Sequence, residues 1–187
     1  YFPASDPIHK ATIIPRGRAL GMVMRLPEND RNSITLEQMK SHIAVAMAGR
    51  VAEELIFGRS KVTSGASSDI RMATNMAKSM VTEWGLSEEV GPIYHGTCSE
   101  DRYVGSEGEK FRSEKLSETI DKEIKKIVDE GYNLAKKILT DNVEELHILA
   151  KALIEHETLS GKQIKNLLAG NDLNSEENAV FPKKEKG

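Results

Sequence analysis

The stretch TSGASSDIRMATNMAKSMVTEWG, residues 63–85, places a short polar turn in front of a periodic apolar pattern. From Ile70 onward, apolar residues recur at steps of three and four, which puts their side chains on one face of a helix. Asp69 stands where this period begins, and there a carboxylate can accept hydrogen bonds from the free amide groups of a helix start. The pattern predicts a helix that ends near Gly85. On spacing alone, Asp69 is interpreted as the helix cap, with metal ligation as the alternative.

Composition restricts the class of protein around this helix. The 187 residues suffice for one domain with a good core, or for a domain with a small helical appendage. A formal charge of −3 argues against nucleic acid as a partner, because such binding needs a basic patch. Cys98 is the single cysteine, so no internal disulfide forms and a reducing compartment is expected. No apolar run reaches the roughly 20 residues of a membrane span. Because the chain starts at Tyr1 rather than methionine, we expect a soluble piece of a longer protein.

The N-terminal region has the pattern of a β-hairpin. Residues 11–14 are β-branched and apolar, and residues 20–26 alternate, so we expect two strands with a turn at residues 16–19. Pro15 removes a backbone donor, which is tolerated mainly at a sheet edge. One side of the first strand is therefore predicted to be unpaired and able to accept an extended peptide. On the sequence alone, a small hairpin that covers the helical core is favoured, and peptide docking is the alternative.

Two longer helices are predicted. The first begins after Thr35 and ends at Gly58, and its Gly49 suggests a close approach of another backbone. The charged cluster Arg50, Glu53 and Glu54 is interpreted as an exposed surface network. The first helix carries an apolar stripe of Leu36, Met39, Ile43, Met47, Val51 and Leu55. The second helix carries Leu116, Ile120, Ile124, Ile127, Leu134 and Ile138.

The second helix is expected to pack on two successors, although it could instead pair with a neighbouring chain. Asp141 with Glu144, and Ser160 with Gln163, supply capping signals for those successors. Residues 91–112 show no period and are predicted to form a loop.

Known catalytic patterns are absent from the sequence. There is no Gly-x-Ser-x-Gly elbow and no Walker-type phosphate loop. No two histidines are four residues apart, so the zinc-protease arrangement on one helix is missing. The histidines are His9, His42, His95, His147 and His156. The residues by themselves therefore indicate a soluble, mainly α chain with one β-hairpin.

Four segments nevertheless occur in an order and spacing that closely resemble the protease domain of the FtsH family of membrane-anchored, ATP-dependent zinc metalloproteases. The segments are DPIHKATIIPRGRALGMVMRLPEND, AGRVAEELIFG, VTSGASSDIRMATNMAKSMVTEWGLS and ETIDKEIKKIVDEGYNLAKKILTDN. The resemblance covers about residues 6–168 and implies a mainly α metalloprotease domain with a small β-hairpin or sheet and a C-terminal helical bundle. It implies a partial peptidase domain at residues 1–169. The end of the chain, residues 170–187, lacks periodicity and is predicted to be a disordered tail.

The resemblance also implies a metal site. In the family, a His-Glu-x-x-His helix lies just before the segment that matches the start of this chain, and it provides two zinc ligands and the catalytic glutamate. No catalytic residue is therefore expected here, and the family's third zinc ligand, an aspartate, matches Asp69. The predicted docking strand, Ala11, Thr12, Ile13 and Ile14, matches a segment that the family places near the cleft. Ala48 and Gly131 depart from the family pattern, in ways that concern packing.

Further expectations follow from the family. The full-length protein would bind zinc, and would bind ATP and magnesium only through an ATPase domain outside this chain. It would assemble as a homo-oligomer, expected to be a hexamer, degrade unfolded polypeptides, and be anchored in a bacterial inner membrane or an organellar equivalent with this domain on the cytoplasmic side. The chain alone would be inactive. The alternative is a non-catalytic module for ring assembly or protein interaction that never binds metal.

Overall fold

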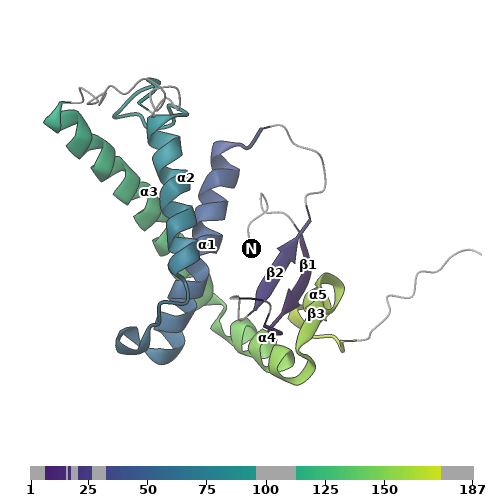
Figure 1. Ribbon diagram of the computed structural model, residues 1–187. Helices are drawn as coiled ribbons and strands as arrows, with labels where there is room; N and C mark the ends of the chain where they lie inside the picture. Colours follow the sequence, from purple (N-terminus) through teal and green to yellow (C-terminus); the bar gives the residue numbers. More distant parts are fainter. Residues whose placement is uncertain (1–6, 16, 18–20, 27–32, 96–112, 174–187) are drawn as a thin grey trace, which may run out of the picture. The chain divides into compact units, whose positions relative to one another are not determined.

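A computed structural model describes residues 7–15, 17, 21–26, 33–95 and 113–173 (Figure 1). These residues form two compact units. The first unit contains residues 33–95 and 113–141. The second contains residues 7–15, 17, 21–26 and 142–173. Helices predominate and the strands are few, which confirms the predicted mainly α class.

The first unit is helical. It consists of α1 (Leu36–Phe57), the 3-10 turn η1 (Arg59–Lys61), α2 (Ser67–Thr82) and α3 (Glu114–Asp141). Thr35 caps α1 in a capping box with Gln38, since each side chain accepts a hydrogen bond from the other residue's backbone amide. Gly58 ends α1 with φ 81°, a conformation that glycine adopts without strain. The predicted bounds of this helix are confirmed.

The core of the first unit lies among its three long helices, because α3 packs against both α1 and α2. Buried apolar residues from all three helices make up this core: Met39, Ile43, Ala46, Met47, Val51, Ala73, Ala77, Met80, Val81, Ile120, Ile127 and Ala135. The expectation that α3 would pack on its two successors was wrong. Its apolar stripe is already used by α1 and α2, which precede it in the chain.

A close backbone approach occurs at Gly131 rather than at Gly49. A Cβ atom at Gly131 would lie 2.5 Å from Cγ2 of Ile43 and 3.3 Å from the backbone nitrogen of Ala44. A Cβ at Gly49 would meet no atom within 4 Å among the described residues, so the close approach predicted there was wrong. Gly131 therefore sets how closely α3 lies against α1.

The second unit combines a three-stranded antiparallel sheet with two helices. The strands are β1 (Ile8–Thr12), β2 (Met22–Arg25) and β3 (Thr158–Ser160), and the helices are α4 (Val143–His156) and α5 (Gly161–Leu168). The predicted hairpin is confirmed, with Thr12 opposite Met22 and Ala11 opposite Val23. The predicted bounds of its first strand, residues 11–14, were wrong, because β1 begins at Ile8 and ends at Thr12. The order of the strands is β2-β1-β3, so β1 is central. The expectation of an unpaired edge on β1 was wrong, because β3 pairs there.

The helices of the second unit pack close to the sheet. Ser160 and Gln163 form the predicted capping box at the start of α5. A Cβ at Gly161 would overlap the carbonyl oxygen of Ile8, so glycine allows α5 to start directly against β1. The cap predicted at Asp141 was wrong: this residue ends α3, and Asn142 occupies the N-cap position of α4. The buried core of this unit consists of Ala11, Ala152, Leu159 and Ile164.

Parts of two predicted segments lie outside the described residues. The predicted loop at residues 91–112 is described only to His95, where it has neither helix nor strand. The predicted tail at residues 170–187 is described only to Leu173. In the part of the chain that the structure describes, no helix is both long enough and apolar enough to cross a membrane.

Candidate metal site

Asp69 is the third residue of α2 and not its cap. The helix begins at Ser67, and its N-cap position is held by Ala66, which makes no side-chain capping hydrogen bond. The capping role favoured by the spacing of the sequence was therefore wrong. Asp69 is half-buried in the first turn, where a helix favours negative side chains.

Two rows of side chains start from Asp69 along α2. One row, at steps of four, continues to Ala73 and Ala77, which are buried in the core of the first unit. The other row, at steps of three and four, continues to Met72 and Met76. Asp69 thus lies where the packed side of α2 meets its open side. A carboxylate in this position can face a group that approaches from the open side.

The loop in front of Asp69 is tied to α1. The Glu53 carboxylate accepts a hydrogen bond from the Thr63 backbone amide at 2.9 Å and another from the Thr63 hydroxyl at 2.9 Å. The Thr63 hydroxyl oxygen in turn accepts from the Gly65 amide at 3.1 Å. Ala66, the N-cap residue of α2, is buried and fixes the end of the loop. The start of α2, and with it Asp69, is held in place by these contacts.

The charged cluster on α1 was predicted to be an exposed surface network, but two of its members, Glu53 and Glu54, make specific hydrogen bonds to other segments. The two hydrogen bonds from Thr63 lower the pKa of Glu53, and Arg50 adds a smaller effect in the same direction. The Tyr132 hydroxyl donates to Glu54 at 2.7 Å, which ties α3 to α1, lowers the pKa of Glu54 and raises the pKa of Tyr132. The sequence did not indicate these partners, because both lie outside α1 and helical periodicity does not report such contacts.

The described residues contain no complete metal site. Among them, no group of three or more histidine, cysteine, aspartate or glutamate side chains lies close enough to hold a metal ion. A catalytic zinc site needs three protein ligands and an open position. The carboxylate of Asp69 is of a type that can serve as one of those three ligands.

The predicted docking residues belong to the second unit. Ala11 and Thr12 are buried in the central strand β1, where they pair with Leu159 and Thr158. The Ile13 amide donates to the Glu157 carbonyl at 2.9 Å. Ile13 and Ile14 have exposed side chains. The backbone of this segment is therefore largely used within the sheet.

The sequence model of peptidase family M41 matches residues 1–167, nearly the whole chain. The chain belongs to this family of peptidases.

Similarity to individual relatives agrees with this family. The chain is 69% identical over 182 residues to the ATP-dependent zinc metalloprotease FtsH of Rickettsia bellii, an alignment that covers 97% of this chain and 28% of that protein. It is 63% identical over 182 residues, 97% of this chain and 28% of the relative, to the protein of the same name from Rickettsia felis. It is 51% identical over 170 residues, 90% of this chain and 27% of the relative, to the one from Caulobacter vibrioides. The chain thus spans somewhat more than a quarter of the length of these relatives.

Proposed function

We propose that this chain is part of the protease domain of a zinc metalloendopeptidase, and that Asp69 provides one of three protein ligands to the zinc. Membership of peptidase family M41 carries this proposal. The position of Asp69 supports it, because the carboxylate stands in the first turn of a helix whose preceding loop is tied down by Glu53. A ligand held in this way loses little conformational freedom when metal binds.

The chemistry divides between this chain and the rest of the full-length protein. Bound zinc would lower the pKa of a water molecule and polarise the scissile carbonyl. Asp69 would hold the metal and would not act as a base. The other two ligands and the catalytic glutamate belong to a part of the full-length protein outside this chain. The chain alone is therefore inactive.

The full-length protein is proposed to degrade unfolded or damaged polypeptides with the help of ATP. Relatives that are 69% and 51% identical to this chain are named ATP-dependent zinc metalloproteases, which supports this proposal. We also propose a membrane-anchored homo-hexamer, with this domain on the cytoplasmic side. ATP and magnesium would bind in the ATPase domain, outside residues 1–187.

Substrate docking is better assigned to β2 than to residues 11–14. β1 is central, so the outer side of β2 is an edge of the described sheet. Met22, Val23 and Met24 on β2 have exposed side chains. An extended peptide can pair with such an edge through its main chain, which tolerates many sequences.

Peptide substrates with altered backbones test this docking mode. A peptide that pairs with β2 loses main-chain donors when alternate residues are N-methylated, and we expect its KM to rise about tenfold. Peptides that carry the same number of N-methyl groups outside the paired segment serve as the control. Equal cleavage of all these peptides would rule out pairing at the sheet edge.

The ligand role of Asp69 is tested in the full-length protein by Asp69→Ala. We expect less than stoichiometric zinc and loss of casein cleavage, with helical circular dichroism unchanged. Asp121→Ala, an exposed aspartate on α3, is the matched control. Full zinc content and activity in Asp69→Ala would show that Asp69 is not a ligand. A full-length protein that never binds zinc would instead favour the non-catalytic assembly module.

A further inference from the structure

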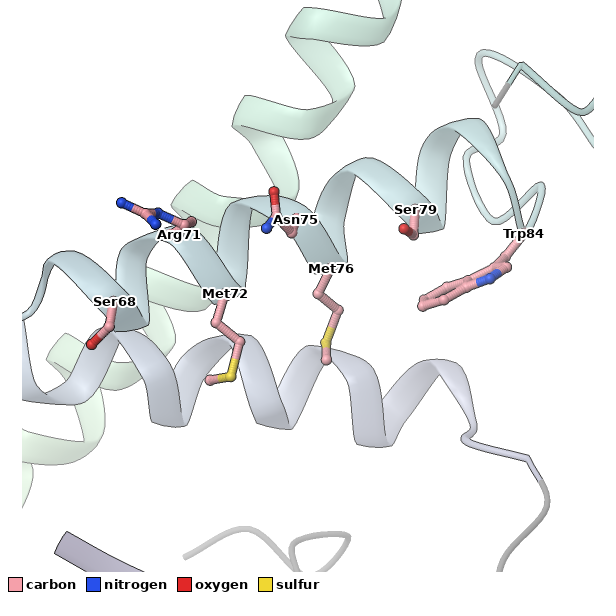
Figure 2. A pocket seen from close by; sticks show the side chains of 7 residues that line it. All are labelled: Ser68, Arg71, Met72, Asn75, Met76, Ser79 and Trp84. Atoms are coloured by element: carbon pink, nitrogen blue, oxygen red, sulfur yellow. The ribbon is translucent and has the colours of Figure 1, made fainter. Parts of the chain in front are cut away.

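Apolar side chains are exposed along α2 and along β2. On α2, Met72 is exposed and points to the same side of the helix as Met76 (Figure 2). On β2, the three consecutive residues Met22, Val23 and Met24 are all exposed. Because successive side chains of a strand point to opposite faces, β2 is apolar on both of its faces.

The main-chain groups of β1 alternate between its two neighbouring strands. The Ile13 amide donates to the Glu157 carbonyl at 2.9 Å, on the side of β3. In an antiparallel sheet the amide and carbonyl of one residue point the same way and successive residues alternate, so those of Thr12 point toward β2. Thr12 lies opposite Met22. The main chain of Met22 therefore points back toward β1.

The same alternation along β2 leaves two residues whose main-chain groups point outward. Met24 and Leu26 point toward β1, and the Leu26 amide donates to the Pro7 carbonyl at 3.3 Å. Val23 and Arg25 alternate with them, so their amides and carbonyls point away from β1. No strand of the described sheet pairs with this side of β2. A strand added there would hydrogen-bond to Val23 and Arg25.

Val23 ends an apolar row that crosses the sheet. Leu159 on β3 and Val23 on β2 both lie directly opposite Ala11 on β1, so the three side chains share a face. The exposed fraction rises along this row from 0% at Leu159 through 7% at Ala11 to 57% at Val23. A side chain opposite Val23 on an added strand would extend the row and cover Val23. The row therefore favours an apolar side chain at that position.

Arg25 provides a positive charge at one end of the same edge. It follows Val23 by two residues and so lies on the same face of the sheet. Among the described residues, no carboxylate forms an ion pair with Arg25. Its opposite residue in β1 is the apolar Ile8. A side chain opposite Arg25 on an added strand is therefore favoured when it is acidic.

We propose that Val23 and Arg25 select substrate segments in which an acidic residue stands two positions before an apolar one. The segment adds as an antiparallel strand, like the pairs already in this sheet, so the residue opposite Arg25 precedes the residue opposite Val23. The residue between them faces Met24, and the residue after them faces Met22, where methionine adapts to an apolar side chain. This inference rests on the proposed protease function and on substrate docking at β2.

The pattern describes a substrate class. A segment that is apolar on both faces is typical of a strand buried within a folded protein. Such a segment reaches an edge strand only when its own protein has unfolded. The edge thus distinguishes unfolded chains from folded ones by the side chains that it pairs with.

Peptide cleavage by the full-length protein tests the pattern. Three peptides share one cleavable sequence and carry Glu, Gln or Lys two positions before a valine. We expect KM to be about fivefold lower for the Glu peptide than for the Lys peptide, with kcat within about twofold, because strand pairing acts equally on the ground state and the transition state. A fourth peptide, with Glu two positions after the valine, should have the KM of the Gln peptide. Equal KM for the Glu and Lys peptides, or a preference for the fourth peptide, would overturn the proposal.

Charge reversal assigns the preference to Arg25. In full-length Arg25→Glu, the order of the Glu and Lys peptides should reverse, and in Arg25→Gln their KM values should become equal. Lys151→Glu, at an exposed position of α4 in the same unit, is the matched control and should keep the wild-type order. A wild-type order in both Arg25 variants would refute the assignment.

Crosslinking identifies what covers the edge. A photoreactive phenylalanine analogue at Val23 should crosslink to a bound peptide at its valine or at a neighbouring residue. A crosslink to a second copy of the protein in the presence of peptide would make β2 an interface between copies and would overturn the proposal.

Failure of this proposal differs from failure of the proposed function. If N-methylation of the peptides weakens cleavage but their charge has no effect, docking at β2 stands and the selection by Val23 and Arg25 is refuted. If the full-length protein cleaves no peptide, the protease function and the selection are refuted together.

Discussion

Glu53 on α1 holds Thr63 through both of its carboxylate oxygens, one bound by the backbone amide and the other by the hydroxyl. Thr63 lies six residues before Asp69, in the loop that leads into α2. We therefore propose that Glu53 positions the loop that leads to the proposed ligand.

Glu53→Gln tests this positioning. The amide retains only one acceptor oxygen for the two Thr63 donors, so the loop gains freedom and zinc affinity of the full-length protein should fall about tenfold. The effect on overall stability should be small, because Glu53 is on the surface. The measurement is a zinc titration against a chelator, with Glu37→Gln on the same helix as control. Unchanged zinc affinity would show that the loop is rigid without Glu53.

The Glu54–Tyr132 hydrogen bond predicts a pH dependence of stability. Because the pKa of Glu54 is lowered from 4.5, its contribution is complete above pH 4.5 and is lost as the pH falls below that value. Because the pKa of Tyr132 is raised from 10.0, its contribution is complete below pH 10.0 and is lost as the pH rises through the raised value.

Tyr132→Phe removes this hydrogen bond. The difference in stability between wild type and variant should be largest near neutral pH and smaller at both ends. Urea unfolding at about pH 4, pH 7 and pH 11 measures it. A difference that stays constant over this range would contradict the assigned pair.

Gly131→Ala should destabilise the first unit by about 1–3 kcal/mol, because the added Cβ would press on the branch methyl of Ile43. Leucine has no methyl group at Cβ, so Ile43→Leu in the same chain should recover part of the loss. The two single variants and the double variant form a cycle measured by urea unfolding. Additive effects would mean that α3 shifts away from α1 as a whole.

Ser87→Ala should cost about 1–3 kcal/mol, because it leaves a buried carboxylate oxygen without its donor. The Ser87 hydroxyl donates to Glu123 at 2.8 Å and accepts from the Val90 amide at 3.3 Å, joining the turn after α2 to α3. Ser60→Ala, on the exposed turn η1, is the control. A melting temperature equal to that of the control would show that the buried pair adds no stability.

The sequence predicted those elements whose signals are local. The stripe of α1 and the capping box of Ser160 with Gln163 each depend on residues within one helix, and both were confirmed. Strand β3 has only three residues, too few for an alternating pattern to be recognised. The sequence therefore did not predict it, and β1 was wrongly assigned to an edge. The close approach at Gly131 depends on Ile43, which is distant along the chain.

The candidate site, too, could be predicted from the sequence only in part. Spacing alone suggested a cap at Asp69, because the apolar pattern begins only after it. The helix in fact begins at Ser67, and the two serines of its first turn are polar and do not contribute to that pattern. The ligand role came from the resemblance to a family. The tie between Glu53 and Thr63 joins two elements, and no periodic pattern reports such a contact.

The central claim is that the Asp69 carboxylate binds zinc in the full-length protein. Anomalous diffraction at the zinc absorption edge, from crystals of that protein, locates the metal without reference to activity. We expect a zinc peak about 2.0–2.2 Å from an Asp69 carboxylate oxygen, with two further protein ligands from outside residues 1–187. A fully occupied zinc whose ligands exclude Asp69 would contradict the account.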